Sequence, residues 1–245
     1  MTRRRAVSLL PVLVLTLITS EFHRFTELLP SKDEVLRRIH EAGAIGIFRV
    51  DSPERCIPAM DALIRGGLDV FEVTLTTPGA LGVISEARKK YGEKALVGVG
   101  TVIDKTGAES GLAAGAQFVV SPSLDKEVID VCSSRGVVSC PGTFTTTEIV
   151  HAWKWGADLI KVFPISQVGP EYIRAIRGPL PQVRLVPTGG IDATSIGGYL
   201  NAGAYAVGVG GGLISSSAIS EGRYDALTQG AASVVGAVKR ARGQS

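Results

Sequence analysis

The chain is poor in the residues that build metal centres and disulfide frameworks. Its 245 residues include only three cysteines and three histidines. The cysteine count is odd, and the spacing of Cys56, Cys132 and Cys140 matches no metal or redox motif. The histidines lie far apart in the sequence. We therefore expect no metal site and no disulfide scaffold, and the odd cysteine count without a disulfide pattern favours a reducing compartment, the cytoplasm.

The chain also lacks an excess of either charge outside its N-terminus. Its 26 lysines and arginines against 23 acidic residues give a formal net charge of +3. Arg3, Arg4, Arg5 and Arg24 against Glu21 account for that excess, so the rest of the chain is neutral. No basic stripe remains of the kind that nucleic-acid binding needs, and we expect no nucleic-acid partner.

No apolar run is long enough to span a bilayer, which takes about 20 residues in a helix. The N-terminal run from Ala6 to Thr19 follows three arginines and has the n-region and h-region of a secretory signal. We interpret residues 1–30 as an extension that is either signal-like or dispensable. Nothing downstream resembles a secreted protein, so we expect a cytoplasmic protein without stable membrane association, with an exported form left open.

From Ser31 onward, short β-branched runs alternate with segments of helical periodicity. An extra N-terminal helix is expected over Ser31–Ala42. The predicted strands are Ala44–Val50, Asp69–Thr76, Ala95–Val102, Ala116–Ser121, Val137–Pro141, Asp158–Pro164, Val183–Pro187 and Ala204–Val209. The predicted helices between and after them include Pro53–Arg65, Pro78–Tyr91, Gly107–Ala114, Leu124–Arg135, Thr147–Trp155, Ala193–Asn201 and Tyr224–Arg240. This order implies parallel βαβ units, and we predict an α/β protein with a single (β/α)8 TIM barrel over residues 31–245.

Charged and hydroxyl side chains stand in strands that should be apolar. Side chains of a barrel strand alternate between the interior and the helix layer, and active sites lie at the carboxyl ends of the strands. We expect Arg49, Glu72, Thr101 and Lys161 to converge there, with Val97 and Val99 sharing the inward phase of Thr101. Burying such charges costs several kcal/mol each unless they pair or serve a function.

Lys161 is the sharpest of these signals, because it lies in the apolar run Leu159–Pro164. Burial disfavours an ammonium ion, and a neutral amine is the species that attacks a ketone to form an imine. The alternative is a lysine that snorkels to solvent. The sequence therefore predicts an imine-forming lysine.

Two further charged residues fit roles around that imine. Glu72 could move protons during formation of the imine and cleavage of a carbon–carbon bond. Arg49 could hold a substrate carboxylate bidentately. A structural ion pair, of Glu72 with Arg49 or Lys161, is the alternative for both residues. Thr101 could donate a hydrogen bond to a bound carboxylate or keto oxygen.

Two glycine-rich segments follow the seventh and eighth predicted strands. They are Pro187-Thr188-Gly189-Gly190 and Gly208-Val209-Gly210-Gly211-Gly212. Backbone amides after these strands commonly bind phosphate in this barrel, and glycine allows the anion to approach closely. Simple turns are the alternative interpretation.

In order and spacing, these motifs make the chain resemble the bacterial 2-keto-3-deoxy-6-phosphogluconate (KDPG) and 4-hydroxy-2-oxoglutarate aldolases. The resemblance runs from about Ser31 to the C-terminus. The motifs that carry it are Phe71-Glu72-Val73-Thr74, Val97-Gly98-Val99-Gly100-Thr101-Val102, Val120-Ser121-Pro122, Ile160-Lys161-Val162-Phe163-Pro164 and Val186-Pro187-Thr188-Gly189-Gly190-Ile191.

The resemblance implies a class I aldolase without metal or cofactor, typically a homotrimer. Lys161 would form the Schiff base and Glu72 would be the general acid and base. Arg49, Thr101 and Phe163 would line the pyruvate site, Pro122 and Thr188 would contact substrate, and Gly189, Gly190, Gly210 and Gly211 would hold the phosphate. The partners would be a 2-keto acid and a phosphorylated aldehyde: KDPG would give pyruvate and glyceraldehyde 3-phosphate, and 4-hydroxy-2-oxoglutarate would give pyruvate and glyoxylate.

The chain departs from the family at three positions that bear on substrate choice. Ser123 follows Pro122 where many members have a glycine. Thr76 stands where many members have an arginine, and Gly211 where members often have a serine. The open alternatives are 2-dehydro-3-deoxy-6-phosphogalactonate aldolase, another phosphate-binding TIM-barrel enzyme that needs no imine, and a degenerate barrel used for binding or assembly.

Overall fold

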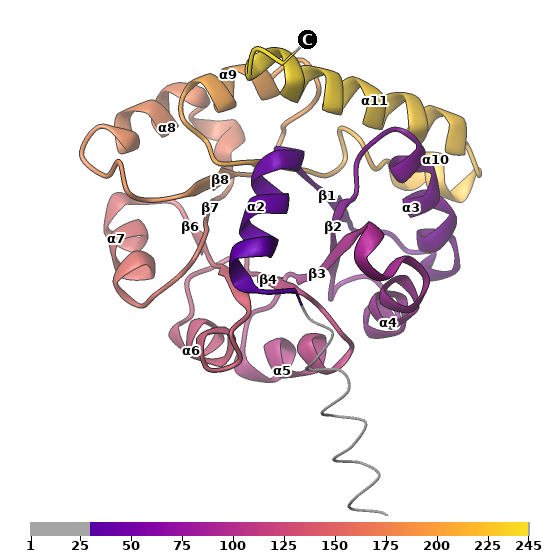
Figure 1. Cartoon of the computed structure of the whole chain (residues 1–245), viewed down its shortest axis with the longest axis horizontal. Helices are drawn as coiled ribbons and strands as arrows, with labels where there is room; N and C mark the ends of the chain where they lie inside the picture. The colour runs from indigo at the N-terminus through magenta and orange to yellow at the C-terminus, as the bar shows by residue number, and fades with distance from the viewer. Residues whose placement is uncertain (1–29, 245) are drawn as a thin grey trace, which may run out of the picture. The chain divides into compact units, whose positions relative to one another are not determined.

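Parallel strands and helices alternate through residues 30–244, the part of the chain that the computed structural model describes (Figure 1). The interpretation of residues 1–30 as an extension concerns residues that lie almost entirely outside this range. The strands are β1 Ala44–Phe48, β2 Val70–Thr74, β3 Leu96–Gly100, β4 Phe118–Val120, β5 Val138–Cys140, β6 Gly142–Thr143, β7 Ile160–Val162, β8 Leu185–Pro187 and β9 Val207–Val209. The α-helices are α2 Lys32–Ala42, α3 Cys56–Arg65, α4 Ala80–Tyr91, α5 Lys105–Ala113, α6 Lys126–Ser134, α7 Thr146–Lys154, α8 Pro170–Arg177, α9 Ile196–Asn201, α10 Ser216–Ser220 and α11 Tyr224–Ala241.

The strands form a curled parallel sheet. Six are paired in the order β5-β4-β3-β2-β1-β9, and three in the order β6-β7-β8. Backbone bonds also run between the two groups: the amide of Leu159 donates to the carbonyl of Ser139, and that of Tyr205 to the carbonyl of Leu185. An isolated bridge joins Thr188 to Gly208. The predicted α/β class with a parallel sheet is confirmed.

Each predicted strand contains an observed one, but the fifth is interrupted. Val137–Pro141 was expected as one strand, whereas β5 ends at Cys140 and β6 begins at Gly142. Proline has no N–H to donate to a ladder, so Pro141 interrupts the pairing. β5 pairs with β4 and β6 with β7, and Pro141 itself accepts a hydrogen bond from the amide of Lys161.

Two helices were not among the predicted segments. α8 begins with Pro170 at its first turn, a common helix start, and buries Ile173 and Ile176. α10 is a five-residue helix capped by the Ser215 side chain, which accepts from the amide of Ala218. Its short length leaves too few residues for a periodic signal.

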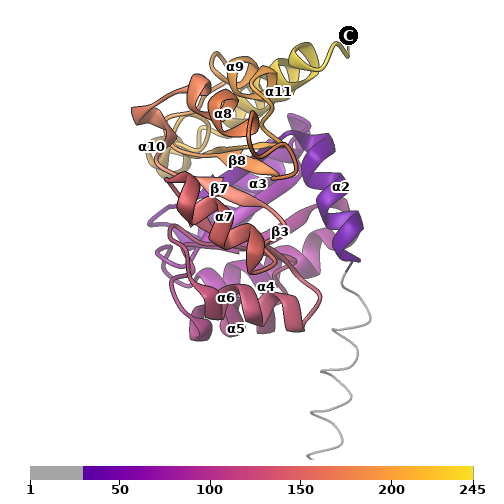
Figure 2. The ribbon, with the colours of Figure 1, turned by 90° about the vertical axis from the view of Figure 1, so that its left-hand side faces the viewer.

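Helix α2 covers one end of the strands. The Ser31 side chain caps it by accepting from the amide of Glu34. Its apolar side chains Val35, Leu36 and Ile39 are buried in one cluster with interior residues of the strands. In Figure 1 α2 lies across the centre of the strands, and Figure 2 shows α2 at one end of them and α10 at the other.

The inward phase predicted for the third strand is wrong. Leu96 of β3 lies in the same interior cluster as Val70 and Phe118, so Gly98 and Gly100 share its phase. Val99 points to the helix layer, because a Cβ added at Gly111 of α5 would lie 2.5 Å from its Cγ1. Glycine has no side chain to mark the interior face, and the alternating valines therefore suggested the opposite one.

Candidate active site

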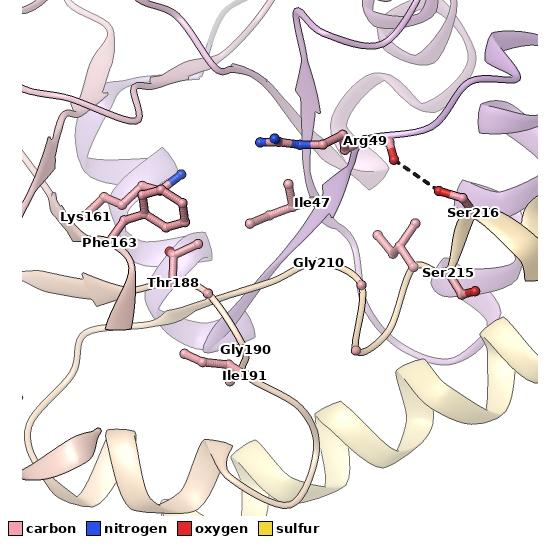
Figure 3. A pocket seen from close by; sticks show the side chains of 14 residues that line it. Ile47, Arg49, Lys161, Phe163, Thr188, Gly190, Ile191, Gly210, Ser215 and Ser216 are labelled. Carbon is pink, nitrogen blue, oxygen red and sulfur yellow. Dashed lines mark hydrogen bonds between the residues drawn. The ribbon is translucent and has the colours of Figure 1, made fainter. Parts of the chain in front are cut away.

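A cavity of about 420 Å³ opens beyond the carboxyl ends of the strands (Figure 3). It gathers side chains and backbone from β1, β7 and the segments after β7, β8 and β9. Among the predicted site residues, those that line it are Arg49, Lys161, Phe163, Thr188, Gly189, Gly190, Gly210 and Gly211. Residues more than 150 positions apart in sequence therefore share one cavity.

Lys161 is a buried amine in the middle strand of the β6-β7-β8 group. It pairs with Gly142 on one side and Val186 on the other, and it is 6% exposed. Its Nζ lies 5.1 Å from the centre of the Phe163 ring. Among the described residues no carboxylate oxygen lies within 4.0 Å of Nζ, so no ion pair holds the amine back from the cavity. The snorkelling alternative does not fit this burial.

Glu72 is not one of the residues that line the cavity. Its side chain on β2 is 2% exposed. Burial raises the pKa of Glu72, and the positive charges of Lys161 and Arg49 act in the opposite direction. No salt bridge of the described residues includes Glu72, so the structural ion pair considered for it is absent there. A buried carboxyl group whose pKa is raised holds a proton more readily than an exposed one, which suits a group that acts as an acid as well as a base.

Arg49 and Thr101 meet although Thr101 follows the outward phase of β3. Thr101 has a φ of 58°, a left-handed conformation that a β-branched residue rarely adopts. This turn ends the strand alternation and brings the Thr101 hydroxyl to Arg49, whose Nη2 donates to Oγ1 at 3.4 Å. Figure 3 shows the guanidinium of Arg49 and the amine of Lys161 extending into the cavity toward one another.

The two glycine segments line the cavity below these cations. Gly189 and Gly190 have φ values of 107° and 71°, conformations that favour glycine. A Cβ added at Gly190 would lie 2.9 Å from Cβ of Ser166, whereas one at Gly211 would meet nothing within 4 Å. The space next to Gly211, where a side chain would start, is thus open.

Sequence reasoning missed two serines that line this cavity, Ser215 and Ser216. They follow Gly212 after Leu213 and Ile214, and the run Ser215–Ser217 was the available signal. Their proximity depends on how the chain turns after β9, which periodicity does not reveal.

Pro122 does not line the cavity. It follows β4 and lies against Gly142, where an added Cβ would come within 2.3 Å of the Pro122 carbonyl group. Thr101 is likewise outside the lining residues, and it reaches the site through Arg49.

Between residues 30 and 244, no group of three His, Cys, Asp or Glu side chains is placed to hold a metal ion. The cysteines Cys56, Cys132 and Cys140 are buried and unpaired. Of the helices described, none has the length and apolar character needed to cross a membrane.

Residues 35–230 match the sequence model of the KDPG and KHG aldolase family. The chain belongs to this family. It is 33% identical over 170 residues to the 2-dehydro-3-deoxy-6-phosphogalactonate aldolase of Escherichia coli K12, covering 69% of this chain and 83% of that enzyme. It is also 33% identical over 186 residues to the KHG/KDPG aldolase of the same strain, covering 76% of this chain and 87% of that enzyme.

Solved structures of the family agree with the fold. A native KDPGal structure superposes with a TM-score of 0.76 at 30% identity, covering 82% of this chain and 96% of that one. The KDPG aldolase from Legionella pneumophila, in which pyruvate was captured as a covalent carbinolamine, superposes with a TM-score of 0.75 at 29% identity, covering 80% and 96%. The expected family and its aldolase activity are confirmed.

Proposed function

We propose that this aldolase cleaves KDPG, and also 4-hydroxy-2-oxoglutarate, through a Schiff base at Lys161. The observation that carries the proposal is a buried amine without a carboxylate partner, facing a cavity that a guanidinium enters from the other side. A 2-keto acid presents a carbonyl carbon next to a carboxylate. Arg49 would bind the carboxylate bidentately, and the neighbouring carbonyl would then face Lys161.

The reaction would begin with attack of the Lys161 amine on the keto carbon and loss of water, which leaves an iminium ion. The bond between the third and fourth carbons then breaks, and its electron pair moves into the iminium ion to give an enamine. The proton of the fourth-carbon hydroxyl leaves as the aldehyde departs. Protonation of the enamine and hydrolysis of the imine release pyruvate and restore the amine.

Glu72 would carry the protons of these steps. Because Glu72 does not line the cavity, the transfer would run through a water molecule between its carboxyl group and the substrate. Its raised pKa suits a group that must alternate between acid and base. The Thr101 hydroxyl would steady the guanidinium of Arg49, and the Phe163 ring would pack beside the imine.

The far end of the cavity would hold the substrate phosphate. The segments Thr188–Gly190 and Gly210–Gly211 would offer backbone amides to it, with Ser215 and Ser216 beside them. A 2-keto-3-deoxy-6-phosphogalactonate substrate differs from KDPG in configuration at one carbon, and the similarity to aldolases of both kinds makes it the second candidate.

The finer features of the architecture are part of the same proposal. Residues 31–245 would form a single closed (β/α)8 barrel with α2 as its extra N-terminal helix, and the chain would assemble as a cytoplasmic homotrimer. The half-exposed Trp153 on α7 and the exposed Ile103 after β3 offer apolar surface for assembly. Light scattering on the purified protein would give the oligomer mass.

Borohydride reduction in the presence of pyruvate tests the chemistry. We expect a covalent adduct on the peptide that contains Lys161, and none with Lys161→Arg, which keeps the charge but cannot form the imine. Absence of an adduct on active wild-type enzyme would overturn the mechanism. Turnover of KDPG, the phosphogalactonate epimer and 4-hydroxy-2-oxoglutarate would then rank the substrates, and equal rates with and without phosphate would overturn the phosphate site.

A further inference from the structure

We propose that a set of hydroxyl groups fixes the backbone on both sides of Arg49 and thereby positions its guanidinium for the substrate carboxylate. The set comprises the threonine cluster, defined as Thr74, Thr76 and Thr77, together with Ser216. The inference rests on the carboxylate-binding role proposed for Arg49. It assigns four positioning residues, none of which reacts with substrate.

The backbone that carries Arg49 lies beyond the end of regular pairing. The β1–β2 register runs through Gly46, Ile47 and Phe48, and its last pair is Phe48 with Val73. Strand β1 also ends at Phe48. Arg49 and Val50 therefore need other partners for their backbone groups.

The threonine cluster supplies these partners from the end of β2. The Thr74 hydroxyl donates to the carbonyl of Phe48 at 3.0 Å. The Thr77 hydroxyl accepts from the amide of Val50 at 3.3 Å and lies 3.4 Å from the same Phe48 carbonyl. Thr74 and Thr77 are both buried. The backbone is therefore held on each side of Arg49.

The hydroxyls of the cluster also bond to one another. Thr74 Oγ1 lies 3.0 Å from Thr76 Oγ1 and 3.3 Å from Thr77 Oγ1. Each hydroxyl has one proton to donate and can accept from others, so Thr76 can donate to Thr74 while Thr74 donates to Phe48. Such chains strengthen their members and favour one arrangement.

Ser216 contacts the same stretch of backbone from another element, α10. Its hydroxyl donates to the carbonyl of Arg49 at 3.4 Å, shown as a dashed line in Figure 3. Ser216 is the first residue of α10 and lies four residues after Gly212, the last glycine of the segment that follows β9. The backbone of Phe48, Arg49 and Val50 is thus contacted by hydroxyls from two elements, while Thr101 contacts the guanidinium.

This arrangement matters because an arginine side chain has many rotamers. Ordering a long charged side chain costs up to about 2 kcal/mol, and a movable backbone beneath it would add to that cost. Bidentate binding of a carboxylate also needs the guanidinium plane in one orientation. A fixed backbone lowers the cost of reaching this orientation when substrate binds.

The test uses Thr77→Val, which keeps the side-chain shape and removes the hydroxyl. Adduct formation at Lys161 is titrated with pyruvate and with methyl pyruvate, whose ester carries no charge for Arg49. We expect the concentration that gives half-maximal adduct to rise roughly tenfold for pyruvate, as the loss of about two hydrogen bonds allows, and less than about twofold for methyl pyruvate.

Two further variants control this result. Thr77→Ser restores the hydroxyl and should recover the wild-type ratio of the half-maximal concentrations of pyruvate and methyl pyruvate. Thr228→Val, which removes a half-buried hydroxyl from α11, should leave the ratio unchanged.

Other outcomes overturn the inference. If a folded Thr77→Val shifts both ligands equally or shifts neither, the cluster does not position Arg49. Should Thr77→Val fail to fold, Ser216→Ala replaces it, with Ser233→Ala on α11 as the control; an unchanged ratio in Ser216→Ala overturns the inference equally. Arg49→Gln separates the two proposals: if Arg49→Gln also leaves the ratio unchanged, the carboxylate role of Arg49 itself fails.

Discussion

The carboxyl group of Glu72 occupies the space that a side chain at Gly100 would need. A Cβ added at Gly100 would lie 1.8 Å from Oε1 of Glu72 and 2.3 Å from its Cδ. The two residues face each other across β2 and β3, where Glu72 pairs with Gly98 and Thr74 with Gly100. The place of the proposed proton carrier is thus set by a residue without a side chain.

The first prediction follows from this contact. Gly100→Ala should displace the Glu72 carboxyl group and lower kcat by roughly 100-fold or more, the usual contribution of a general acid or base. Borohydride trapping of pyruvate at Lys161 should persist at high pyruvate. Gly82→Ala is the matched control, because a Cβ at Gly82 in α4 meets nothing within 4 Å. A Gly100→Ala enzyme with normal kcat would show that the carboxyl position is unimportant.

The second prediction concerns the pH dependence of stability. Burial raises the pKa of Glu72 above its ordinary value of 4.5, so the folded protein binds this proton more tightly than the unfolded chain. The stability that the proton provides is full below pH 4.5 and is lost as pH rises through the folded pKa.

Glu72→Gln, whose side chain does not ionise, tests whether ionisation of Glu72 lowers the stability of the folded protein as pH rises. Urea unfolding across the range from about pH 4 to about pH 8 should show the wild type losing free energy of unfolding relative to Glu72→Gln as pH rises. Parallel profiles for the two proteins would mean that the pKa of Glu72 is the same in the folded and unfolded states.

The third prediction tests the phosphate end of the cavity by charge. A Cβ added at Gly211 would meet nothing within 4 Å, so a side chain can begin there without a clash. The carboxylate of an aspartate there would repel a phosphate, and Gly211→Asp should raise KM for KDPG by roughly tenfold or more. KM for 4-hydroxy-2-oxoglutarate should change little. Gly211→Ala controls for size, and an equal effect of Gly211→Asp on both substrates would place the phosphate elsewhere.

The fourth prediction separates stability from activity in α2. Ile39 is fully buried in the cluster that α2 forms with the strands. Ile39→Ala should lower the free energy of unfolding by about 2–5 kcal/mol, because it leaves a cavity. The kcat/KM of the folded enzyme should stay within about twofold. Arg37→Ala, on the exposed face of α2, removes only surface ion pairs and should leave the free energy of unfolding close to that of the wild type.

The sequence predicted those parts of the site where a side chain marks the inner face of a strand. Lys161 was identified because a single charge interrupts an apolar run, and its burial agrees with that interpretation. β3 was assigned the wrong phase because Gly98 and Gly100 carry no side chain on the inner face. Thr101 nevertheless reaches Arg49, because its left-handed φ ends the alternation of side chains between the two faces of β3.

Other features depend on contacts between distant segments, which periodicity does not encode. Ser215 and Ser216 reach the cavity because the chain turns back after β9. The threonine cluster lies next to β1 only through pairing of β1 with β2. The break at Pro141 could have been expected from the missing N–H of proline.

The glycines of β3 give the inner wall a stretch of bare backbone, and neighbouring strands fill it. The Phe118 ring occupies the space at Gly98, and the Glu72 carboxyl group that at Gly100. Even a small substitution at these positions should therefore be poorly tolerated. Alanine, the smallest possible addition, is a severe change at Gly98 and Gly100, while at Gly211 an added Cβ meets nothing within 4 Å. Gly98 and Gly100 contribute no functional group, yet they determine where the neighbouring side chains lie. An engineer who wants to change the substrate range should therefore leave these two glycines unchanged.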